Sequence, residues 1–366
     1  MNIFYKLIKS PYFFLLILAS ISLIIAFTLV KTPLEGNGDM LSHLEAMNFL
    51  QEKPYTEDFM INRVLTSPLM LYSSIFFGYL IDSNKTGMMI VNLIFYFLII
   101  LVFYKLVELI YQNRTISLLS SILFFTNYCM FNYGTTYRAD IGGWFFFLLS
   151  TLFAVKYYQS RLENKKVFFY SILSASIGVL FKEYGALGLI SLSLLILFSN
   201  IAFWEKIKKI FKAGILFSII PGLYYLFFYF KFDYSYFNWY FQNFDKYVIN
   251  PEITGGNYSL ILMIKVLGWL FLIGWPIFLW GVYQLWKNYD KQKIIYLTAL
   301  LPASLVFLAW PSFTQRVAFI LVPWLALISG YGLSKIKNRY IIILILLIYA
   351  SINYLTRPWL LSMINL

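Results

Sequence analysis

Long apolar runs alternate with short polar segments along almost the whole chain. A helix needs about 20 largely apolar residues to cross a bilayer, and the runs are of roughly that length. The runs predicted to span are 12–30, 87–104, 116–131, 141–155, 167–181, 185–203, 213–230, 259–283, 294–310, 317–334 and 340–356. The pattern therefore predicts an all-α polytopic membrane protein with about eleven transmembrane helices.

Clusters of Lys and Arg fix the predicted orientation. The clusters are 156–166, 206–212, 287–293 and 335–339. Each neighbouring pair of clusters encloses two predicted spans, so all of them lie on one side, and basic loops mark the cytoplasmic side. The N-terminus is therefore predicted inside and the C-terminus outside. The short apolar run 65–81 fits this count only as a surface or re-entrant segment.

Composition agrees with the membrane assignment and excludes other classes. The chain is 61% hydrophobic and 12% charged, whereas soluble domains are about 45–50% apolar and about 25% charged. Its net charge of +13 is spread over short loops and forms no basic face for nucleic acid. We expect one transmembrane domain over 1–366, with an uncleaved first helix, in the cell membrane of a prokaryote. No separate soluble domain is predicted.

The loop 31–86 is the first long polar interruption, and it is predicted to lie outside. It holds the single histidine, His43. Apolar spacing over 41–51 predicts an amphipathic helix on the membrane surface, with Asp39 at its N-cap position. Asp39 is then either a cap on a solvated helix or a general base at the rim of a membrane cavity. His43, on the same helical face, is open to three readings: metal ligand, proton partner or interfacial residue.

Further charged residues lie at the predicted outer ends of spans. They are Arg63, Arg138, Asp140, Lys182, Glu183 and Arg316. Outward arginines oppose the usual charge bias and indicate an anionic ligand, because guanidinium matches phosphate oxygens; contacts with lipid headgroups would explain each one separately. The Lys–Glu pair is either a snorkelling pair in a tight turn or a functional pair at membrane depth. The aromatic outer loop 231–258 predicts an interfacial belt or a lid.

The order and outward placement of these motifs resemble the GT-C glycosyltransferases that use polyprenyl-phosphate sugars, in particular the protein O-mannosyltransferase and aminoarabinose transferase branch. The motifs are Gly38–Asp39–Met40 with His43, Arg63 before Pro68, Arg138 and Asp140 before the fourth span, Lys182–Glu183 between the fifth and sixth, and Arg316 before Pro323–Trp324. Met40 stands where that family often has a second acid.

The resemblance implies a transfer reaction on the outer face. Asp39 would be the general base of an inverting displacement, and a lipid, a glycan or a protein would be the acceptor. The donor phosphate would be held by Arg63, Arg138, Lys182 and Arg316. His43, Asp140 and Glu183 would support the site. Some relatives use a divalent metal, but one histidine and few acids do not predict a metal site, and no other cofactor is expected.

Two alternatives from other classes share this membrane setting. A transporter or flippase of a lipid-linked glycan would also need a basic outer cavity, but transporters often show broken helices or repeats, and the sequence shows neither. A glycan polymerase or ligase would act on polyprenyl-diphosphate oligosaccharides, and its catalytic loop usually lies late in the chain. Nucleotide-binding and zinc motifs do not occur in the sequence, so coupling to ATP is not predicted.

Overall fold

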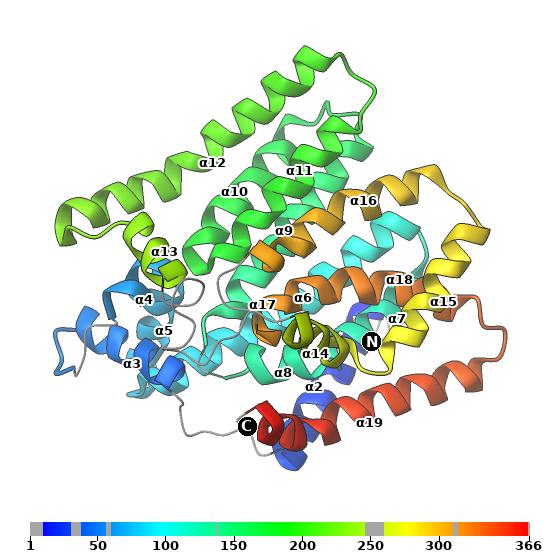
Figure 1. Cartoon of the computed structure of the whole chain (residues 1–366), viewed down its shortest axis with the longest axis horizontal. Coiled ribbons are helices and arrows are strands. Elements are labelled where there is room, and N and C mark those ends of the chain that lie inside the picture. The colour runs from blue at the N-terminus through cyan, green and yellow to red at the C-terminus, as the bar shows by residue number, and fades with distance from the viewer. Residues whose placement is uncertain are drawn as a thin grey trace, which may run out of the picture.

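The computed structural model describes residues 10–30, 38–55, 60–136, 138–245, 260–309 and 314–364, and within these ranges every regular element is a helix. The first elements are α2 (Pro11–Val30), α3 (Gly38–Leu50), α4 (Met60–Thr66), α5 (Pro68–Ile81), α6 (Asn84–Tyr111), α7 (Arg114–Phe125), α8 (Tyr128–Gly134), α9 (Asp140–Gln159), α10 (Lys165–Phe181) and the 3-10 helix η1 (Glu183–Ala186). The all-α fold class is therefore confirmed (Figure 1).

The second part of the chain continues the same way. Its elements are α11 (Leu187–Leu197), α12 (Phe203–Phe232), α13 (Tyr236–Phe244), α14 (Leu260–Phe271), α15 (Gly274–Lys287), α16 (Lys291–Leu305), η4 (Val306–Ala309), α17 (Gln315–Ala318), η5 (Phe319–Leu321), α18 (Val322–Ser334) and α19 (Arg339–Ile364). Helix α13 lies inside the predicted aromatic loop 231–258, whose later part falls outside the described residues. Its presence shows that this loop is partly helical.

Six helices in the described part are long and apolar enough to cross a membrane, and a bent pair adds a seventh. They are Pro11–Thr28, Asn84–Tyr111, Asp140–Gln159, Phe203–Phe232, Lys291–Ala309 and Arg316–Ser334. Shorter apolar helices occur at Pro68–Ile81, Arg114–Phe125, Glu183–Leu197 and Arg339–Leu355. Every predicted span overlaps at least one helix. The protein is thus a polytopic helical membrane protein, and the number eleven stays a prediction.

Helices α5 and α6 form a tight hairpin. A Cβ added at Gly87 would lie 2.3 Å from the backbone oxygen of Ser74, so glycine is needed for this close approach. With 14 residues, α5 is about 21 Å long, which is shorter than a hydrocarbon core of about 30 Å. This length supports the prediction that 65–81 does not span the membrane.

Within the described residues, one pair of apolar helices that could form a span is sharply bent, contrary to the expectation of unbroken helices. Residues Met263–Phe271 and Gly274–Lys287 meet at an angle of 82°. A second break separates α7 from α8, and its Asn127 amide donates to the Leu270 carbonyl oxygen at 2.8 Å and to the Tyr349 hydroxyl at 3.2 Å. Irregular backbone at membrane depth needs such partners, because lipid offers none. The expectation of unbroken helices is therefore wrong.

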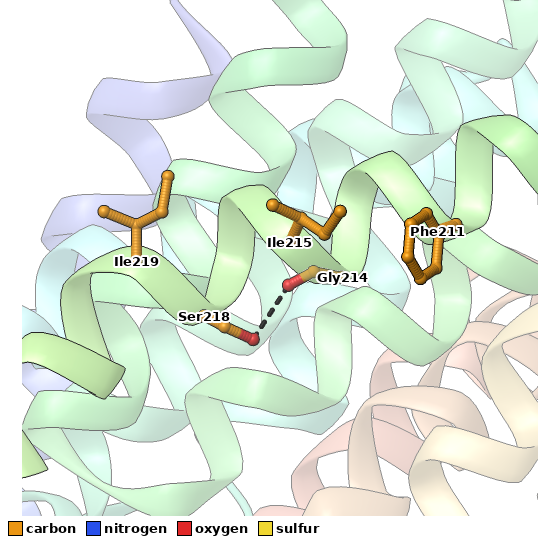
Figure 2. A pocket seen from close by; sticks show the side chains of 5 residues that line it. All are labelled: Phe211, Gly214, Ile215, Ser218 and Ile219. Atoms are coloured by element: carbon orange, nitrogen blue, oxygen red, sulfur yellow. Dashed lines mark hydrogen bonds between the residues drawn. The ribbon is translucent and has the colours of Figure 1, made fainter.

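The helices differ widely in burial. In the apolar stretch of Arg316–Ser334, which includes α18, 89% of the residues are buried. In the apolar stretch of α12 only 17% of the residues are buried. Helix α12 contacts α10 and α11 and runs along the edge of the bundle (Figure 1). Its outer side carries a shallow groove lined by Phe211, Gly214, Ile215, Ser218 and Ile219 (Figure 2). Such an apolar surface on a membrane helix faces lipid.

Candidate functional site

The beginning of α9 carries the first part of the site. Asp140 lies in the first turn of α9, where a helix N-terminus favours a negative charge, and it is only 1% exposed. Its Oδ2 lies 3.7 Å from Nε of Arg316 on α17. Within the described residues, neither carboxylate oxygen accepts a hydrogen bond. Asp140 is therefore not the exposed partner of Arg138 that a simple surface pair would require; it is a buried carboxylate that positions Arg316.

Arg138 lies in the non-helical segment just before α9. Its guanidinium carbon lies 5.1 Å from the ring centroid of Tyr133 on α8, which allows a cation–π contact. Burial raises the pKa of Tyr133 to about 12, and the nearby positive charges of Arg138 and Arg316 oppose this rise. Asp140 acts on the same tyrosine with the opposite sign. Both arginines and Asp140 therefore surround Tyr133.

The turn between α10 and α11 carries a buried ion pair. Lys182 Nζ lies 3.0 Å from Glu183 Oε2, and each side chain is 8% exposed. The turn is closed by hydrogen bonds from Lys182 N to the Gly178 oxygen and from Gly185 N to the Lys182 oxygen, each at 2.9 Å. A Cβ at Gly185 would lie 2.1 Å from the backbone of Gly178, so this turn requires glycine. The predicted neighbour pair is present and buried.

Small and aromatic residues of α9 bring these charged segments together. A Cβ at Gly143 would lie 2.6 Å from Lys182 Cβ, so α9 packs directly on the Lys–Glu turn. The Trp144 ring lies 6.5 Å from that of Tyr184 in η1 and 4.2 Å from that of Phe319 in η5. Around the first two turns of α9 the structure thus gathers Arg138, Asp140, Lys182, Glu183 and Arg316. We refer to these five residues as the α9 charge cluster.

Arg63 belongs to a neighbouring segment. Its Nε donates to Ser42 Oγ at 2.9 Å, which ties α4 to α3. The Tyr224 hydroxyl of α12 donates to the Val64 carbonyl oxygen at 2.6 Å, which ties α4 to α12. Helix α4 also contacts α13 and α10, the helix that ends at the Lys–Glu turn, and Figure 1 shows α3, α4 and α13 near one end of α12. Arg63 therefore lies on a helix that packs against α10, α12 and α13, and its role as a phosphate ligand stays a prediction.

Tyrosines connect the Arg63 segment with Glu183. Tyr225, next to Tyr224 in sequence, has its ring 5.6 Å from that of Tyr236 on α13. The pKa of Tyr236 is raised above its usual value, chiefly by burial and next by the charge of Glu183. The rings of Tyr225 and Tyr236 thus join α12 to α13, and α13 also contacts α4.

Helix α3 is present, and the predicted apolar residues Ala46 and Met47 are fully buried. Met40, His43 and Ala46 are buried, whereas Leu41 is 49% exposed. His43, with 2% exposure, is therefore not an interfacial residue. Asp39 lies in the first turn of α3, and its side chain falls outside the described residues, as do Glu57 and Asp58. The role of Asp39 as a base stays a prediction.

The described residues offer no group of three or more His, Cys, Asp or Glu side chains that could hold a metal ion.

Sequence reasoning missed three residues that organise the site. Asn92 donates to the backbone before α9, Gly143 admits the Lys–Glu turn, and Trp144 fills the space between η1 and η5. Of the three, only Asn92 could have been recognised in the sequence, because an amide side chain within a long apolar run needs a polar partner. The other two are recognised only by what they touch.

Comparison with known proteins places this arrangement in context. Residues 66–225 match the family described as dolichyl-phosphate-mannose-protein mannosyltransferase. No protein with a curated description matches the chain significantly.

Three solved structures share the fold. ArnT from Cupriavidus metallidurans bound to undecaprenyl phosphate matches with a TM-score of 0.62 and 12% identity, over 88% of this chain and 60% of that one. The Archaeoglobus fulgidus oligosaccharyltransferase in the apo form matches with a TM-score of 0.57 and 14% identity, over 95% and 55%. The archaeal oligosaccharyltransferase AglB from the same organism, in complex with an inhibitory peptide and a dolichol-phosphate, matches with a TM-score of 0.57 and 12% identity, over 93% and 55%.

The chain thus spans 55% to 60% of the length of these structures. At such identities the likeness concerns the fold, and the family match adds a sequence likeness over the part that carries four residues of the α9 charge cluster. The predicted resemblance is confirmed: this chain has the fold of the polytopic GT-C glycosyltransferases.

Proposed function

We propose that the protein is a membrane glycosyltransferase that moves a sugar from a polyprenyl-phosphate donor to an acceptor on the outer face. The observation that carries the proposal is the α9 charge cluster, because the three separate segments that bear Arg138, Lys182 and Arg316 all pack around the first turns of α9. The family match over 66–225 supports it, and so do structural neighbours that bind undecaprenyl phosphate or a dolichol-phosphate.

The cationic residues suit the donor phosphate. As the sugar leaves, negative charge grows on the phosphate, and fixed guanidinium and ammonium groups stabilise this charge in the transition state. Arg316, Arg138 and Lys182 would supply them, with Arg63 contributing from α4. The N-terminus of α9 adds a partial positive charge in the same place. Asp140 and Glu183 would hold Arg316 and Lys182 in position through their ion pairs.

The reaction is an inverting single displacement. Asp39 would take the proton from the acceptor hydroxyl or amine while the acceptor atom bonds to the anomeric carbon. The bond from that carbon to the phosphate oxygen breaks at the same time, and polyprenyl phosphate leaves with the electron pair. One base and one stabilised leaving group are enough for this chemistry. His43, four residues after Asp39 on the same helical face, would support the base.

A lipid-linked glycan flippase is the second candidate, because the structure contains broken helices. The 82° bend between α14 and α15 is of the kind that transporters use for substrate sites. A flippase would need the cationic cluster to bind phosphate but would break no bond.

The deciding experiment offers purified protein in nanodiscs a panel of radiolabelled polyprenyl-phosphate sugars, with lipid, glycan and peptide acceptors. Release of polyprenyl phosphate by wild type, lost in Asp39→Asn and strongly reduced in Arg316→Gln, supports the proposal. Arg339→Gln, at the predicted inner start of α19, is the matched control and should remain active. Transfer undiminished in Asp39→Asn refutes the role of Asp39. Reaction only with polyprenyl-diphosphate oligosaccharides indicates a polymerase or ligase, and translocation in liposomes without transfer indicates a flippase.

A further inference from the structure

A buried amide on α6 holds the backbone that precedes α9. Asn92 is fully buried, and its Nδ2 donates to the carbonyl oxygen of Arg138 at 2.9 Å and to that of Thr136. A carboxamide carries two donor hydrogens, so both are used on this segment. We propose that Asn92 is a positioning residue that fixes Arg138 and Asp140 for binding the donor phosphate. Its effect on transfer rests on the proposed function.

The backbone between α8 and α9 needs hydrogen-bond donors from another element. Residues 135–136 and 138–139, between α8 and α9, belong to no helix, and Arg138 N donates to the Thr136 oxygen at 2.9 Å. Backbone carbonyls in a buried site need partners, and lipid supplies none. Asn92 provides one hydrogen bond to each of the carbonyl oxygens of Thr136 and Arg138. The direction in which the chain enters α9 is therefore set by α6.

The Asn92 side chain makes no other hydrogen bond within the described residues. Its Oδ1 has no hydrogen-bond partner within the described residues, so the side chain is used for its donors alone. Its neighbours on the buried face of α6 include Met88, Phe95 and Tyr96, and an apolar side chain would pack among them without a polar penalty. A polar residue at this depth is costly, and within the described part of the chain its hydrogen bonds go to the carbonyl oxygens of Thr136 and Arg138.

The consequence for the site follows from the chain geometry. The Arg138 guanidinium contacts Tyr133, and Asp140 pairs with Arg316, so a shift of this segment moves both cationic groups relative to a bound phosphate. A displacement of about 1 Å is enough to reduce catalysis about a hundredfold. Asn92 thus links α6, which carries no cationic residue of the cluster, to the proposed anion site.

The test compares Asn92→Leu, which removes both donors, with Asn92→Asp, which places an oxygen against two carbonyl oxygens. Asn92→Gln keeps the donors and serves as the conservative variant, and Tyr96→Phe changes a polar group one turn along α6 as the control. In nanodiscs, amide hydrogen exchange is measured over the whole chain, together with binding of undecaprenyl phosphate as the probe. We expect exchange over 135–140 to rise at least tenfold in the Leu and Asp variants, with probe affinity falling about tenfold and partial recovery in the Gln variant.

Unchanged exchange over 135–140 in Asn92→Leu overturns the proposal. A uniform rise over the whole chain also overturns it, because that is the signature of lost stability only. If the Leu and Asp variants do not fold, Asn92→Gln against Tyr96→Phe decides by the same exchange measurement. A local rise without any loss of probe binding supports the positioning of this segment and counts against the phosphate role of Arg138, so the two proposals fail separately.

Discussion

Replacing Asp140 by Asn tests whether the α9 charge cluster works as a unit. The substitution keeps the size of the side chain and removes its charge. Arg316 then loses its 3.7 Å partner while remaining 21% exposed in a mostly buried environment. Removing a carboxylate from beside a partly buried guanidinium costs free energy and weakens the hold on the orientation of that side chain. Both stability and transfer should therefore fall.

The magnitude follows from the geometry. At 3.7 Å and an effective dielectric constant of about 20, Coulomb's law gives about 4.5 kcal/mol for the pair. Breaking a fully buried pair typically costs about 3–5 kcal/mol, and the partial exposure of Arg316 reduces this to about 2–3 kcal/mol. If the same loss is felt in the transition state, kcat/KM falls about a hundredfold, since each 1.36 kcal/mol is a factor of about ten.

Thermal unfolding in detergent and the transfer assay measure the two effects. Asp140→Asn, Arg316→Gln and the double variant form a cycle, and residues in contact should show a coupling energy of about 1–3 kcal/mol. Glu205→Gln is the control, because Glu205 and Lys208 form an exposed pair whose loss should cost less than about 1 kcal/mol. Strictly additive effects of the two single variants would refute the reasoning, as would full activity of Asp140→Asn.

Three further predictions concern the other parts of the site. Gly143→Ala should lower the free energy of unfolding by about 1–3 kcal/mol and reduce transfer, because the added Cβ would lie 2.6 Å from Lys182 Cβ. Gly214→Ala is the control and should be neutral, because a Cβ there meets nothing within 4 Å. Equal effects of the two substitutions would contradict this packing. Lys182→Met should destabilise by about 3–5 kcal/mol by leaving Glu183 buried without its cation, and adding Glu183→Gln should recover part of that loss in the same unfolding assay. Asp39→Asn should abolish transfer but leave undecaprenyl phosphate binding within about twofold, because a general base does not hold the leaving group. Parallel loss of both would contradict the role of Asp39 as a base and show that it positions the groups that bind the phosphate.

The sequence alone determined the membrane class, the placement of the helices and the segments that carry charge. These follow from properties that act along the chain: about 20 apolar residues are needed to span a bilayer, and basic loops stay inside. The buried Lys182–Glu183 pair was predicted for the same reason, since its partners are adjacent in sequence. Which apolar runs would break was not predicted, because the partners of a broken helix, such as Asn127 for Leu270, lie far away in the chain.

Only the tertiary structure decided which charges meet. Asp140 is buried and lies 3.7 Å from Arg316, a residue 176 positions later in the chain, so it is not a surface partner of nearby Arg138. His43 is buried together with Met40 and Met47 of the same helix, and apolar spacing alone does not reveal that a histidine belongs to the packed face. Helix packing is set by close contacts such as that between Gly143 and Lys182, which depend on shapes that hydrophobic periodicity does not encode. The helices follow from the sequence pattern, and the site follows from how they pack.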